Sequence, residues 1–198
     1  MEEKELQRFI DEHIPYRMHA IAWGLIFLKA TREWSQIKRM EITLDGELSI
    51  IGYHPSLTNP SIEMAIIYSR VLLEFLGLGT NKDKTQLTVI KDRKPGDVGI
   101  EKFKAIDGSN LTKISVNSAL DTYPGKRTDA EKALLLLISN AHKAVAHLTV
   151  GPEKHDNFRD LLELGCRGVL TLVHLKFYRA MGMEPPPYEV ATGTLNKT

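Results

Sequence analysis

The clearest structural signal in the sequence is the stretch from Leu57 to Gly79, which reads LTNPSIEMAIIYSRVLLEFLGLG. Asn59 offers a helix cap, Pro60 suits the first helical position, and Glu63 falls in the positively polarised first turn. Two glycines end the pattern. The predicted buried side consists of apolar residues at helical spacing: Ile62, Ala65, Ile66, Leu72, Leu73 and Leu76. The stretch therefore predicts a long amphipathic helix.

Three other stretches also have a helical pattern. The first covers residues 3–36 and is expected to bend near Pro15, because proline lacks a backbone donor and clashes with the preceding turn. The second runs from the Thr128–Glu131 capping box to the Gly151-Pro152 pair. The third covers residues 156–181 and stops before three consecutive prolines.

A short β-hairpin is predicted within residues 39–51. Apolar residues alternate on both sides of Asp45-Gly46, and this dipeptide accepts the positive φ angles of a tight turn. Together, these patterns predict a mainly α protein, a bundle of four or five helices with one small β-hairpin insert.

The second half of the first predicted helix is apolar on nearly every side. Its residues Ile21, Trp23, Leu25, Ile26, Phe27 and Leu28 are therefore all predicted to be buried. We expect Trp23 and Trp34 to pack in the core and at a helix end rather than to stack on nucleic-acid bases.

The length of 198 residues fits one domain, which we place at 1–183, with a flexible tail at 184–198. Residues 80–126 show a weaker pattern and a mildly basic composition, and are predicted to form an irregular basic insert. A solvated connection is the default expectation there, with a short strand at 87–90 or a helical turn near 100–103 as local structure.

Composition excludes several classes of function. The formal net charge of +1 gives no strong overall attraction to nucleic acid or acidic membranes. The single Cys166 excludes an intrachain disulfide and a zinc site built from cysteines, and we expect it to be a small core residue. The N-terminus has no secretory pattern, and the most apolar early stretch is too short to span a bilayer. We therefore expect a cytoplasmic protein with no membrane association.

A polar stripe lies near the end of the late helix, within SNAHKAVAHLTVG, Ser139 to Gly151. Asn140 and His147 are seven residues apart and nearly overlie one another on a helix, and Lys143 falls between them. Imidazole exchanges a proton near neutral pH, and a neighbouring cation stabilises negative charge on phosphate. These residues are the candidate binding and catalytic groups.

Two helices together resemble those of the HEPN superfamily: IIYSRVLLEFLG, which carries Arg70, and ISNAHKAVAHLT, which carries His147. The resemblance covers roughly residues 61–181. It implies a helical domain that dimerises and, in active members, cuts RNA without metal. It further implies His147 as general base or acid, Asn140 and Lys143 as phosphate-positioning groups, and Arg70 as a second cation.

One departure from the family pattern bears on activity. Active members carry an arginine, a polar neighbour and then a histidine four to six residues on. Counting back from His147 reaches Asn140, Ala141 or His142, and none is arginine. Lysine at 143 also lacks the bidentate fork of arginine. We therefore expect a HEPN-like protein, RNA- or nucleotide-associated, without efficient nuclease activity.

Two alternative functions stay open. The first is a non-catalytic helical module for dimerisation or protein interaction, since amphipathic helices, an insert and a proline-rich tail suit it. The second is a metal-dependent helical hydrolase, suggested by the sequence cluster His142, His147, Glu153, His155 and Asp156. The helical metal signature places ligands at i and i+4, and these histidines form no such pair. We expect no metal and no cofactor, a homodimer, and RNA or a protein as partner.

Overall fold

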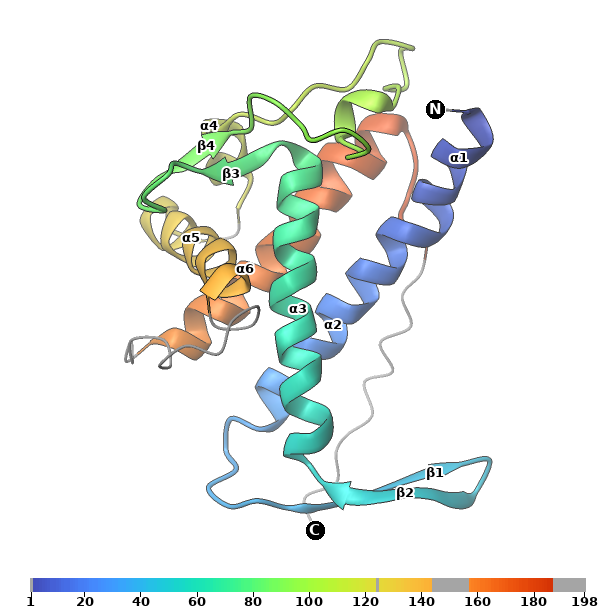
Figure 1. The fold of residues 1–198 in the computed structure, drawn as a ribbon, viewed down its shortest axis with the longest axis vertical. Helices are drawn as coiled ribbons and strands as arrows, with labels where there is room; N and C mark the ends of the chain where they lie inside the picture. Colours follow the sequence, from blue (N-terminus) through green and yellow to red (C-terminus); the bar gives the residue numbers. More distant parts are fainter. Residues whose placement is uncertain (1, 124, 144–156, 187–198) are drawn as a thin grey trace.

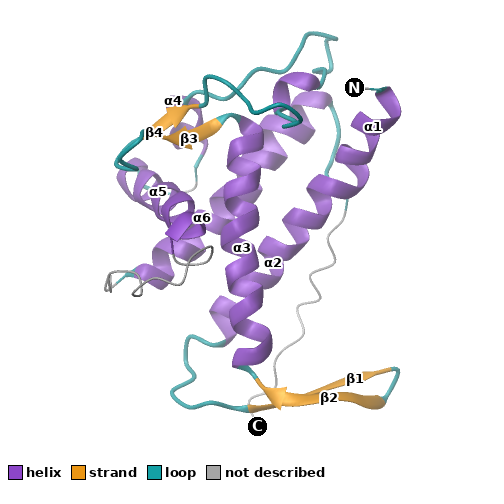
Figure 2. Cartoon of the chain, viewed as in Figure 1, coloured by secondary structure: helices purple, strands orange, loops and turns teal. Residues whose placement is uncertain are grey.

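The computed structural model describes residues 2–123, 125–143 and 157–186. These residues form a mainly α fold in which long helices pack side by side (Figure 1). Two small antiparallel sheets lie at opposite ends of the helix α3 (Figure 2). The predicted fold class is confirmed. Across the described ranges, no helix is both long enough and apolar enough to cross a membrane.

The N-terminal helical segment is continuous but contains an irregular turn. Helix α1 (Glu3–Arg8) leads into the π-helical turn η1 (Phe9–His13), which leads into α2 (Ile14–Ala30). Pro15 lies in the first turn of α2, where its missing N–H costs nothing. The wider π turn before it accommodates the proline ring. A π turn precedes Pro15, where we expected a bend, and the helix ends at Ala30 rather than at residue 36.

The hairpin and the long helix follow directly. Strands β1 (Arg39–Leu44) and β2 (Glu47–Tyr53) pair antiparallel, with a register irregularity between Ile42 and Thr43. Helix α3 (Pro55–Leu76) then begins earlier than predicted, since the carbonyl of His54 already accepts the amides of Leu57 and Thr58. Pro60 therefore lies inside α3 instead of opening it.

The segment 80–126 is more ordered than the solvated connection that we expected. Strand β3 (Leu78–Thr80) pairs with β4 (Leu87–Val89), and the 3₁₀ turn η2 (Ile100–Lys102) and helix α4 (Val116–Thr122) follow. The segment also supplies buried side chains to the core: Leu87, Ile100, Phe103, Leu111, Ile114, Ala119, Leu120 and Tyr123. The sequence did not predict these core positions, because the segment is mostly polar and its apolar residues are spaced without a regular period.

The last two long helices complete the bundle. Helix α5 (Arg127–Lys143) begins just before Thr128, so Thr128 lies in its first turn instead of capping it. Helix α6 (Phe158–Val173) continues through the π turn η3 (His174–Tyr178) and the 3₁₀ turn η4 (Arg179–Met181). Both α5 and α6 pack against α3, which is the central helix of the fold.

Candidate functional site

A groove lies between α2 and α3. The two helices pack closely because Gly24 has no side chain: a Cβ there would lie 2.3 Å from the Cβ of Ala65. The same carbon would lie 3.0 Å from the carbonyl oxygen of Ser61. This contact fixes the spacing of the helices, and the groove opens along the outer side of their seam.

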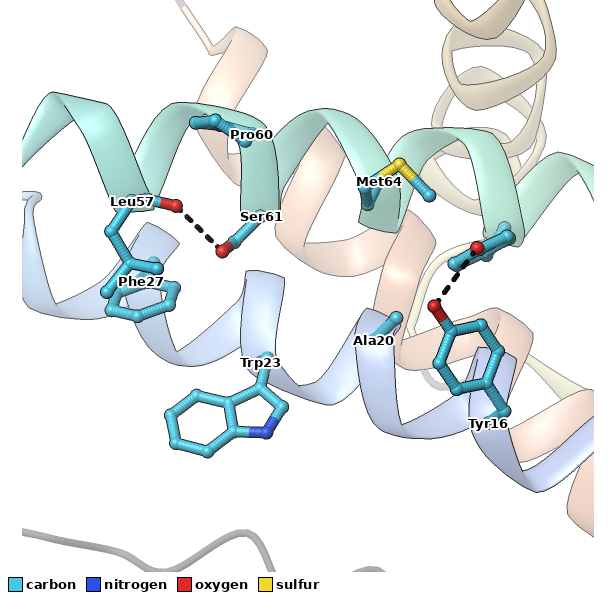
Figure 3. A pocket seen from close by; sticks show the side chains of 9 residues that line it. Tyr16, Ala20, Trp23, Phe27, Leu57, Pro60, Ser61 and Met64 are labelled. Atoms are coloured by element: carbon cyan, nitrogen blue, oxygen red, sulfur yellow. Dashed lines mark hydrogen bonds between the residues drawn. The ribbon is translucent and has the colours of Figure 1, made fainter. Parts of the chain in front are cut away.

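The groove has a volume of about 420 Å³ and is lined mostly by apolar side chains (Figure 3). We call it the α2–α3 groove and define it by its lining residues: Tyr16, Ala20, Trp23, Phe27, Leu57, Pro60, Ser61, Met64 and Tyr68. On α2 these positions are three or four residues apart, and on α3 they are as well, apart from the adjacent pair Pro60 and Ser61, so one stripe of each helix forms one wall. A cavity of this size falls in the volume range of ligand-binding pockets in proteins.

Large aromatic side chains in the groove are exposed to solvent. Trp23 is 46% exposed and Tyr16 is 59% exposed. The Trp23 ring stacks on Phe27, with centroids 5.8 Å apart and planes tilted by 28°. The prediction that Trp23 is buried is therefore wrong. Because α2 is apolar on nearly every side, its sequence could not show which side faces solvent.

Polar groups mark one end of the groove. The Tyr68 hydroxyl donates to the Tyr16 hydroxyl at 3.5 Å, and the Arg17 guanidinium lies 5.5 Å from the centre of the Tyr68 ring. The hydrogen bond with Tyr16, with burial, raises the pKa of Tyr68. The Ser61 hydroxyl donates to the Leu57 carbonyl at 2.7 Å, within its own helix. The groove therefore offers an apolar surface with a positive charge near one end.

Only some of the residues predicted to bind phosphate lie within the part of the chain that the structure describes. Arg70 lies on α3 and its Nε donates to Glu74, one turn along, at 2.7 Å. Asn140 lies on α5 and donates to the Leu136 carbonyl at 2.9 Å. The two helices do pack against each other. His147 and the side chain of Lys143 lie outside the described residues.

The histidine and carboxylate cluster considered for a metal also lies outside the described residues, apart from the backbone of His142. Within the described part of the chain, no group of three or more His, Cys, Asp or Glu side chains could hold a metal ion. Cys166 is fully buried beside Ser69, whose hydroxyl lies 3.6 Å from the sulfur. Burial raises the pKa of Cys166 to about 12, so it is a core thiol rather than a nucleophile.

Comparison with known proteins adds no relative: no protein family, curated protein or solved structure matches this chain.

Proposed function

We propose that this protein is a non-catalytic interaction module, and that the α2–α3 groove binds the apolar face of an amphipathic helix from a partner protein. The observation that carries the proposal is the solvent exposure of Trp23 and Tyr16 along a helix seam. Large aromatic side chains in an apolar hollow are typical anchors of protein interfaces.

The shape of the groove supports a helix as its occupant. The lining residues of α3 run from Leu57 to Tyr68, three turns of helix, which span about 16 Å at the usual rise per residue. An elongated apolar trough between two helices matches the side of a third helix that presents anchors every three or four residues. The small side chains of Ala20 and Ser61 leave room for those anchors.

The charge at one end of the groove determines the direction in which the partner helix binds. Arg17 lies beside Tyr68, and its charge favours an acidic residue at that end of the bound helix. The hydroxyls of Tyr16 and Tyr68 add hydrogen-bonding groups at the same place. The partner helix is therefore apolar along one face, with a carboxylate near Arg17.

The RNA-associated alternative depends on His147 and Lys143, outside the described residues. Among the described candidates, Arg70 and Asn140 already bond within their own helices, to Glu74 and Leu136. The groove, by contrast, carries large exposed side chains that a partner would bury. We therefore favour protein interaction over RNA association.

Replacing Met64 with glutamate tests the proposal, because it places a charge on the groove wall. We expect the tagged protein, isolated from its native cells, to elute with a protein partner and the Met64→Glu variant to elute without it. The same carboxylate at the hairpin residue Leu44, which is 61% exposed, should leave the complex intact. Size-exclusion chromatography with mass spectrometry measures both.

Thermal unfolding by circular dichroism checks that Met64→Glu still folds, and Trp23→Ser provides a second groove variant at a half-exposed position. Loss of the partner in both groove variants supports the proposal. Retention of the partner in both, or isolation of RNA in place of a protein, contradicts it.

A further inference from the structure

A second hollow lies where the N-terminal helical segment meets the C-terminal end of α3 and the segment 80–126. Its volume is about 150 Å³, and none of its described lining residues lines the α2–α3 groove. We call it the η1 pocket, and its walls include Phe9, His13, Arg17, Leu72, Phe75 and Asp97. Pockets for drug-sized ligands measure about 300–1,000 Å³, so a smaller molecule would fill this one.

An irregular turn supplies one wall of the η1 pocket. The π turn η1 carries Phe9 and His13 at its two ends, and their rings contact each other with centroids 4.9 Å apart. Both side chains line the pocket, together with Ile14 at the start of α2. Single π turns within α-helices are rare and often occur at functional sites. The position of η1 therefore favours a binding role for this pocket.

Arg17 brings a positive charge to the pocket. Its side chain is partly buried, and its Nη1 donates to the His13 carbonyl at 2.6 Å. The guanidinium also lies 5.5 Å from the centre of the Tyr68 ring. Within the described residues, no carboxylate forms an ion pair with Arg17. These two contacts orient the guanidinium and leave it with further N–H donors, which suit a carboxylate held by two parallel hydrogen bonds.

A negative charge reaches the same pocket from another part of the chain. Asp97, which precedes η2, accepts a backbone amide of its own turn at 3.2 Å and has no ion-pair partner in the described part of the chain. The other charged lining residues are already paired, Glu74 with Arg70 on its own helix. Arg93 is paired with Glu101. The charges that remain for a ligand are therefore those of Arg17 and Asp97.

We propose that the η1 pocket binds a free α-amino acid with an apolar side chain. The α-carboxylate pairs with Arg17, the ammonium group pairs with Asp97, and the side chain packs against apolar residues such as Leu72 and Phe75. Arg17 and Asp97 do not pair with each other, so a ligand has room between their charged groups.

The balance of charge favours a zwitterion over a simple anion. Two arginines and two carboxylates line the pocket, so its formal charge is zero when His13 is neutral. A ligand with a single charge would leave either Arg17 or Asp97 without a partner, whereas an amino acid pairs with both. The pocket does not depend on the proposed role of the α2–α3 groove. Arg17 borders both, so binding is measured without the helical partner.

Isothermal titration calorimetry of the full-length protein with L-valine tests the proposal. Two analogues keep the carbon skeleton: 3-methylbutanoate lacks the amino group, and 2-methylpropylamine lacks the carboxylate. We expect L-valine to bind at one site, and each analogue to bind about ten-fold more weakly or worse, because one charge of the pocket stays unpaired.

Two variants assign the charges separately. Asp97→Asn should bind L-valine and 3-methylbutanoate with nearly equal Kd, and Arg17→Met should do the same for L-valine and 2-methylpropylamine. Arg8→Met, at an exposed position paired with Glu12, should bind as the wild type does. Circular dichroism checks that each variant folds. No binding of L-valine at millimolar concentration would overturn the proposal, as would 3-methylbutanoate binding as tightly as L-valine to the wild type or unchanged selectivity in the folded Asp97→Asn variant.

Discussion

Replacing Gly168 with alanine is expected to lower the free energy of unfolding by about 3 kcal/mol, since overpacking a core and breaking a buried hydrogen bond each cost between about 1 and 3 kcal/mol. Gly168 lies on α6 against the ring of Tyr123, which is only 5% exposed. A Cβ at Gly168 would lie 1.8 Å from two ring carbons. The ring must therefore move.

Tyr123 cannot move without losing a bond. Its hydroxyl donates to the Leu164 carbonyl at 2.6 Å. Burial raises the pKa of Tyr123, so the hydroxyl stays protonated and donates throughout the physiological range. Alanine is the better helix former by about 1 kcal/mol, and the clash outweighs this gain.

Urea unfolding followed by circular dichroism measures the change. Arg167→Ala, the adjacent and exposed position on α6, is the matched control and should change stability by less than about 0.5 kcal/mol. Equal stabilities for Gly168→Ala and the wild type would contradict the packing of Tyr123 against α6.

The second large effect is expected at Arg93, in the segment 80–126. Its side chain is 12% exposed and donates to the Glu74 and Phe75 carbonyls at 2.7 and 3.0 Å. It also forms a two-bond pair with Glu101, at 2.5 and 2.9 Å. One guanidinium thus ties the insert to the end of α3.

Arg93→Met keeps the apolar stem and removes every donor. We expect a loss of about 3 kcal/mol in urea unfolding, because the carboxylate and the two carbonyls lose charged hydrogen-bond donors. Arg8→Met, which removes an exposed arginine paired with Glu12, should cost less than about 0.5 kcal/mol. A similar small loss for Arg93→Met would show that the insert does not depend on this residue.

The same pair predicts a dependence on pH. Burial raises the pKa of Glu101, but the hydrogen bond and charge of Arg93, a backbone hydrogen bond and the charge of Lys113 together outweigh it, and the net pKa is lowered. A carboxyl group with a lowered pKa stabilises the fold above its ordinary pKa, and this contribution is lost as the pH falls through the lowered value. Arg93→Met should therefore lose less stability than the wild type on acidification.

Much of the fold could be predicted from the sequence. The period of α3 and the alternation around Asp45-Gly46 are local signals, and both elements form where those signals lie. The start of α3 differs because the carbonyl of His54 accepts amide protons one turn before the expected cap. The position of a helix end depends on single hydrogen bonds of this kind, and residue helix propensities do not predict them.

Tertiary packing determines which residues are buried at positions where the sequence pattern could not predict it. The segment 80–126 reads as solvated because its apolar residues have no period, yet Phe103 and Tyr123 pack into the core. Trp23 reads as buried because α2 is apolar all round, yet no neighbour covers its outer face within the described residues. The groove depends on Gly24 lying against Ala65, a contact between distant parts of the chain.

The central claim is that the α2–α3 groove holds a partner helix, and photo-crosslinking tests it most directly. A benzophenone amino acid at position 23, irradiated in native cells, should form an adduct with an amphipathic helix of a partner protein. The same group at Trp34, whose ring meets the His54 ring edge to face away from the groove, should form little. Mass spectrometry of the adducts measures this. Equal yields at both positions, or adducts with RNA at position 23, would contradict the claim.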